Sequence, residues 1–85
     1  MARTIRVTIE GESYITLEGV AECYECEYRW VREVYEFGLL GSGVRYDDTT
    51  VVLTSMLDRV AEIRRLHVYH GVDLSAVAAL LRRQR

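Results

Sequence analysis

Residues 15–40 constrain the fold more than any other part of the chain, because they read as two short amphipathic helices joined by a three- or four-residue turn. Thr16 is a suitable N-terminal cap for a helix over 17–24, where apolar residues recur at helical spacing. A second helix is expected over about 27–37, with Gly38 as its left-handed C-terminal cap. Its apolar stripe consists of Trp30, Val31, Val34 and Tyr35. The pattern is typical of a helix-turn-helix.

Two short segments predict β-structure. In residues 3–10, apolar and polar side chains alternate, as in a strand with one buried face that ends at Gly11. The alternating apolar residues are Ile5, Val7 and Ile9. A turn with two glycines then leads into a short extended piece at 44–46. We expect this piece to pair with the first strand and form a small wing.

The second half of the chain predicts two more helices. The longest apolar stripe runs over 50–70 and ends at Gly71, and Asp73 can cap a last helix over 74–83. The stripe consists of Leu53, Met56, Leu57, Val60, Ile63 and Leu66. We therefore expect one domain over 1–85, mainly α with a small two-stranded β element. The expected order is strand, helix, helix, strand, long helix, short helix.

The two halves of the chain differ in charge. Residues 1–40 carry four Arg and eight Glu, so their net charge is 4 − 8 = −4, while the rest carries seven Arg against five acids, which gives +2. Double-stranded DNA carries one negative charge per ~1.7 Å and is bound mainly through Lys and Arg. An acidic helix-turn-helix therefore disfavours DNA and favours a basic protein partner. The simpler alternative is that these glutamates only form a solvated surface.

Candidate partner contacts are the charged and aromatic residues expected on the outer side of the helix pair and on the wing. Charged residues would orient the partner, and Tyr gives a large contact area at low entropic cost. These candidates are Glu22, Tyr24, Tyr28, Arg29, Arg32, Glu33, Glu36, Arg45 and Tyr46. Trp30 is expected mostly in the core, because it shares the stripe of Val31 and Val34.

The segments ITLEGVAECY, WVREVYEFGLL, VRYDD and IRRLHVYHGVDLSAVAALL resemble successive blocks of the CbpM-like chaperone-modulator family, a branch of the MerR-type winged helix-turn-helix fold. The resemblance covers about 5–81 and is most specific at 71–77 and 38–40. It implies a non-enzymatic regulator of the DnaK/DnaJ-type chaperone system. Such a regulator binds the J-domain of a DnaJ/CbpA-like co-chaperone, whose basic helix suits an acidic surface, and inhibits or assembles its interaction with DnaK.

Two other functions stay open. A MerR-like DNA-binding transcriptional regulator, or an excision-type accessory factor, would use Arg29, Arg32 and Arg45. A zinc-stabilised domain would use the four possible ligands Cys23, Cys26, His67 and His70. Their spacing is unusual for such a site, and the apolar stripes are sufficient for folding, so we expect no metal and no cofactor.

The sequence indicates neither an enzyme nor a membrane protein. We find no glycine-rich phosphate loop and no nucleophile beside a base in a motif context. There is also no run of 18 apolar residues and no recognisable export signal, so we expect a cytoplasmic protein that does not enter membranes. A direct contact with DnaK and a homodimer both stay open.

Overall fold

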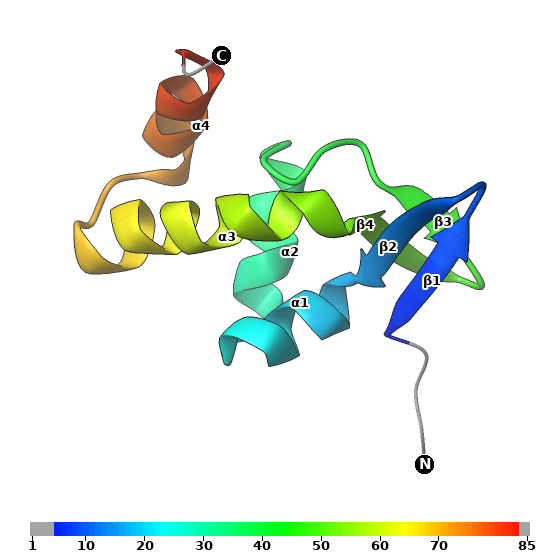
Figure 1. Ribbon diagram of the computed structural model, residues 1–85. Helices are drawn as coiled ribbons and strands as arrows, with labels where there is room; N and C mark the ends of the chain where they lie inside the picture. The colour runs from blue at the N-terminus through cyan, green and yellow to red at the C-terminus, as the bar shows by residue number, and fades with distance from the viewer. Residues whose placement is uncertain (1–4, 84–85) are drawn as a thin grey trace.

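The computed structural model describes residues 5–83 and contains a four-stranded antiparallel sheet beside four α-helices (Figure 1). The sheet curls at one end of the molecule, and the helices lie at the other end. The elements in chain order are β1 (Arg6–Ile9), β2 (Glu12–Thr16), α1 (Leu17–Tyr24), α2 (Tyr28–Glu36), β3 (Val44–Tyr46), β4 (Thr49–Leu53), the 3₁₀ turn η1 (Thr54–Met56), α3 (Leu57–Arg64), the π-helical turn η2 (Arg65–Tyr69) and α4 (Leu74–Arg83).

The predicted winged helix-turn-helix with a two-stranded β element is wrong. The sheet has four strands in the order β1-β2-β4-β3, so β3 pairs with β4 instead of β1. The predicted order of strand, helix, helix, strand, long helix and short helix is also wrong. The segment 50–70, expected as one long helix, contains most of β4, then η1, α3 and η2.

Two tight turns explain the additional strands. Glu10 and Gly11 have φ values of 51° and 83°, and Ile9 pairs with Glu12 across the turn. Asp47 and Asp48 have φ values of 51° and 64° and connect β3 to β4 in the same way. Positive φ at both central residues is the property of type I′ turns, whose twist suits antiparallel strands. Each of these turns therefore continues the chain into a second strand.

The helices of the first half form as predicted. The Oγ1 of Thr16 accepts a hydrogen bond of 2.9 Å from the backbone N–H of Gly19, so the predicted cap of α1 is confirmed. Gly38 follows α2 with φ 78°, which confirms the predicted left-handed cap. The last helix also has its predicted bounds, Leu74–Arg83.

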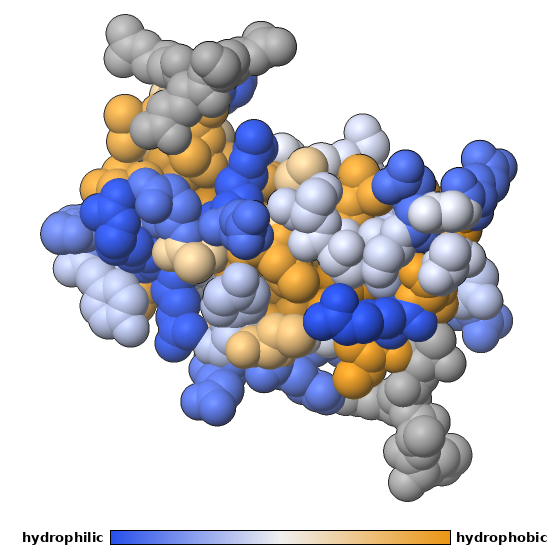
Figure 2. All heavy atoms as spheres, viewed as in Figure 1, coloured by the Kyte–Doolittle hydropathy of each residue, from blue (hydrophilic) through white to orange (hydrophobic). Residues whose placement is uncertain are grey.

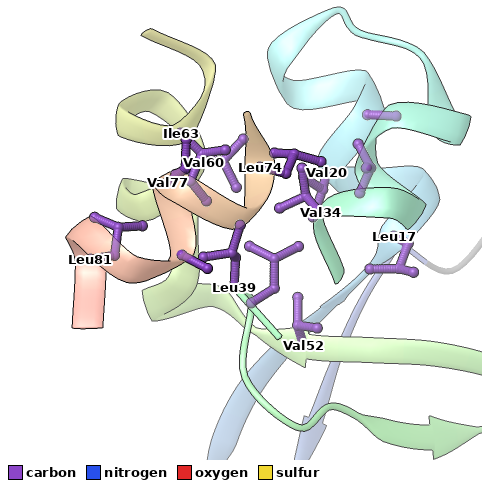
Figure 3. Packing of buried hydrophobic residues seen from close by; sticks show 14 of the residues in the cluster. Leu17, Val20, Val34, Leu39, Val52, Val60, Ile63, Leu74, Val77 and Leu81 are labelled. Atoms are coloured by element: carbon purple, nitrogen blue, oxygen red, sulfur yellow. The ribbon is translucent and has the colours of Figure 1, made fainter. Parts of the chain in front are cut away.

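One hydrophobic core joins the helices to the sheet (Figure 3). Figure 3 shows side chains of all four helices converging above β4, where Val52 lies. The fully buried members include Ile15, Leu17, Val20, Val31, Val34, Leu40, Val52, Val60, Ile63 and Val77. Trp30 packs against this core and is partly buried, as the sequence predicts.

The surface alternates between polar and apolar residues over the view in Figure 2, with apolar atoms over α4. Leu80 on α4 is 40% exposed, in agreement with that view. Within residues 5–83, no helix has the length and apolar character needed to cross a membrane.

Candidate protein-binding groove

A groove lies between α1 and the start of α2. We call it the helix groove, and it is lined by Glu18, Ala21, Glu22, Cys26 and Tyr28. Its cavity volume is about 360 Å³. Glu18 and Glu22 are four residues apart on α1, so their carboxylates lie on the same side of the helix. The groove therefore combines two carboxylates, a tyrosine ring and a thiol.

The turn between α1 and α2 gives the groove its shape. Glu25 has the left-handed conformation, with φ 51° and ψ 47°, and its N–H bonds the carbonyl of Glu22 at 3.3 Å. The N–H of Cys26 bonds the carbonyl of Ala21 at 3.0 Å, which completes a Schellman-type helix end. This turn places the Cys26 side chain in the groove, where burial raises the pKa of the thiol.

The negative charge is concentrated on α1 and the turn. We define the acidic segment as Glu18, Glu22, Glu25 and Glu27. Glu18 is half-buried and the other three are exposed. No Arg or His occurs between Leu17 and Tyr28, so this stretch of the chain carries four negative charges and no positive one.

The outer side of α2 is balanced in charge. Arg29, Arg32, Glu33 and Glu36 are all exposed there. The Nε of Arg32 lies 3.7 Å from Oε2 of Glu36, and its Nη1 donates a hydrogen bond of 3.2 Å to the hydroxyl of Tyr28. The excess of glutamate therefore lies on α1 and the turn, and not on α2.

Tyr24, a predicted partner contact, is used within the protein. Its hydroxyl donates a hydrogen bond of 2.6 Å to the carbonyl of Leu57, and its own carbonyl accepts a hydrogen bond from the Arg64 guanidinium. Burial raises the pKa of this hydroxyl, and the Asp58 carboxylate adds to the effect. Tyr24 therefore connects α1 to α3, and its hydroxyl is not directed at a partner.

The predicted contacts Arg45 and Tyr46 lie in a different region. Both are exposed on β3, at the edge of the sheet, and Arg45 forms a long ion pair of 3.9 Å with Asp48. Tyr46 lines a second groove on the sheet, which does not include any residue of α2. The structure therefore does not bring all the predicted contacts together. It groups Glu22 and Tyr28 in the helix groove.

Three groove residues, Glu18, Ala21 and Cys26, were not among the predicted contacts. Glu18 was not predicted as a contact, although its spacing of four residues from Glu22 was a usable signal. Cys26 was expected to be a small buried residue of the turn, with a role as one of four metal ligands as the alternative, and it is partly buried against the core. Its position in the groove depends on the left-handed residue before it, which the sequence did not indicate.

The possible zinc ligands are not assembled as a site. The Nδ1 of His67 lies 2.7 Å from the carbonyl of Val72, and the imidazole stacks on Trp30 with ring centroids 6.3 Å apart. Among the described residues, no three His, Cys, Asp or Glu side chains are arranged to hold a metal ion.

Comparisons with protein families, curated proteins and solved structures found no match for this chain.

Proposed function

We propose that this protein is a non-enzymatic regulator of the DnaK/DnaJ-type chaperone system that binds the J-domain of a DnaJ/CbpA-like co-chaperone. The observation that carries the proposal is the helix groove, with Glu18, Glu22 and Tyr28 on its walls. The sequence resemblance described above agrees with this function, and the groove gives it a physical basis.

The helix groove suits a basic side chain. Two carboxylates one helical turn apart can accept charge-assisted hydrogen bonds from Arg or Lys, which are about twice as strong as neutral ones. The Tyr28 ring adds a surface on which a cation can lie. The exposed carboxylates of Glu25 and Glu27 extend the negative field around the groove, which speeds the encounter with a basic helix.

The charge distribution also distinguishes this partner from DNA. A J-domain with a basic helix would be attracted to the acidic segment, whereas phosphates would be repelled by it. The arginines on the outer side of α2 are accompanied by glutamates, and Arg32 is within 3.7 Å of one of them. We therefore place the partner contact on α1 and the turn.

The direct test is a calorimetric titration of the protein with the isolated J-domain of its host's DnaJ-type co-chaperone, at low and moderate salt. Nonspecific duplex DNA serves as a parallel ligand. We expect heat with the J-domain that weakens as salt rises, and none with DNA. Heat with DNA alone would contradict the proposal, and so would the absence of heat with both ligands.

A matched pair of variants locates the contact. Glu18→Lys reverses a charge in the helix groove, and Glu33→Lys reverses one on the outer side of α2. We expect the dissociation constant for the J-domain to rise about tenfold or more for Glu18→Lys, because about 1.4 kcal/mol corresponds to a factor of ten. Glu33→Lys should change it by less. Equal losses would show that only net charge matters, and not the groove.

A further inference from the structure

A second groove lies on the curled sheet, between β1 and the hairpin of β3 and β4. We call it the sheet groove, and its cavity volume is about 280 Å³. Its walls include Ile5, Val7, Thr16, Glu18, Tyr46 and Asp47. Residues from both edge strands line it, so the two edges of the sheet border one depression.

Among the described residues, the outer edge of β1 has no strand partner. The carbonyl of Ile5 accepts a hydrogen bond of 2.8 Å from the N–H of Thr16. In an antiparallel pair only every second residue bonds to the opposite strand, so from Ile5 onward every second residue bonds to β2. The N–H and C=O groups of Arg6 and Thr8 therefore point away from β2. Within residues 5–83, no strand pairs with this outer side of β1.

The side chains around the sheet groove indicate what could fill it. Ile5, Val7 and Tyr46 offer apolar contacts, and Tyr46 is 43% exposed. Glu18 and Asp47 add two carboxylates, and none of the described residues that line the groove is an arginine. The groove is thus complementary to a segment that presents apolar and basic side chains on the same side.

We propose that the sheet groove binds an extended segment of a protein partner as a fifth strand, antiparallel to β1. The backbone of this segment pairs with Arg6 and Thr8. Its side chains point alternately inward, toward the sheet groove, and outward, away from it. Its inward residues are apolar and basic, so that a Lys or Arg meets Glu18 and Asp47. The outward residues are uncharged or acidic, because they lie beside the exposed Arg6 side chain.

The occupant is a partner segment and not a second copy of this chain. Both edge strands carry an exposed arginine, Arg6 on β1 and Arg45 on β3. Charged residues on edge strands are a common means of preventing edge-to-edge pairing between copies. Because Glu18 lines both grooves, one partner can contact them together. The sheet groove can bind such a segment whether or not the segment belongs to the partner of the helix groove.

The test is a titration of ¹⁵N-labelled full-length protein with a synthetic peptide, followed by two-dimensional NMR. The probe is an acetylated and amidated heptapeptide with Val at its positions 2 and 6, Lys at its position 4 and Thr elsewhere. A second peptide replaces the Lys with Glu. A third is N-methylated on the two central threonines, which lie opposite Arg6 and Thr8 and would donate to β1.

We expect the amide signals of Arg6 and Thr8 to shift and their hydrogen exchange to slow when the first peptide binds. The dissociation constant should rise about tenfold or more for the Glu peptide, and also for the protein variant with Glu18→Gln and Asp47→Asn. N-methylation should abolish binding. The dispersion of the amide signals in the two-dimensional spectrum of this variant is the control for its folding.

Three results would overturn the inference. One is the absence of shifts at Arg6 and Thr8 with millimolar peptide, and another is unchanged binding of the N-methylated peptide. The third is a dependence of these shifts on protein concentration without peptide, which would show that a second copy occupies the edge. None of these results bears on the J-domain titration, so failure of this inference and failure of the proposed function are distinguishable.

Discussion

Replacing Gly19 with Ala should destabilise the protein, although the same change usually stabilises a helix. Gly19 lies inside α1, where Ala is favoured over Gly by about 1 kcal/mol. A Cβ atom at this position would lie 2.3 Å from Cγ2 of Ile5 and 2.8 Å from Cγ1 of Ile15. Non-bonded carbon atoms prefer about 3.5–4.0 Å. Ile15 is fully buried, so a shift of its side chain would disturb the packing around it.

The expected size follows from these two opposing effects. Overpacking a core costs about 1–3 kcal/mol, so with the helix preference subtracted we expect the free energy of unfolding to fall by about 1 kcal/mol. Urea unfolding followed by circular dichroism measures this change. The slope of the free energy of unfolding against urea concentration should stay the same. Thermal unfolding should show a midpoint lower by about 4–8 °C.

A double-mutant cycle tests the cause. Ile5→Ala removes the Cγ2 atom that the new methyl group would meet. In the Ile5→Ala background, Gly19→Ala should therefore cost less than in the wild-type background, with a coupling energy of about 0.5–1 kcal/mol or more. If Gly19→Ala stabilises the wild-type protein, or if the cycle shows no coupling, the close approach of α1 to Ile5 is refuted.

Three further substitutions test the elements that position the helix groove. Tyr24→Phe should lower the free energy of unfolding by about 0.5–1.5 kcal/mol at neutral pH, because the bond to the Leu57 carbonyl is lost. Since the pKa of Tyr24 is raised above 10.0 in the folded protein, the wild type should also lose stability as the pH rises above that value, and pH-dependent urea unfolding should show a smaller loss for Tyr24→Phe. Thr16→Val should cost about 1 kcal/mol in the same assay, because the N–H of Gly19 loses its cap, and an unchanged stability would contradict the capping role. Glu25→Gly should raise the free energy of unfolding by about 0.5–1 kcal/mol by relieving a left-handed conformation, yet weaken J-domain binding in calorimetry by removing one charge. A lower free energy of unfolding for Glu25→Gly would refute the expected relief of the left-handed conformation.

The sequence was sufficient for the helices of the first half and for the last helix. The cap at Thr16, the apolar spacing of α1 and α2, and the left-handed Gly38 are local signals, because they involve residues within a few positions of one another. The same is true of α4, whose apolar face is buried as its spacing predicts. Such elements can be predicted from the residues that form them.

The strands β2 and β4 were missed because one central residue of each turn is not one of the usual ones. Glu10 and Asp47 adopt positive φ values. Glycine or asparagine at these positions would have been a clearer sign of a hairpin turn. The run Thr49–Val52 is β-branched, which favours a strand, but its continuation into an apolar stripe of helical spacing suggested a helix. Pairing with β2, a partner more than 30 residues away, decided the outcome.

For the candidate site, the sequence determined the sign of the charge and its location in the first half of the chain. It did not determine which side chains act together. The tertiary structure decided that Glu18 and Glu22 share a groove with Tyr28, that α2 is balanced in charge, and that Tyr24 is bonded to Leu57. Charge is a property of composition, whereas a groove depends on how separate segments pack, and only the folded chain brings those segments together.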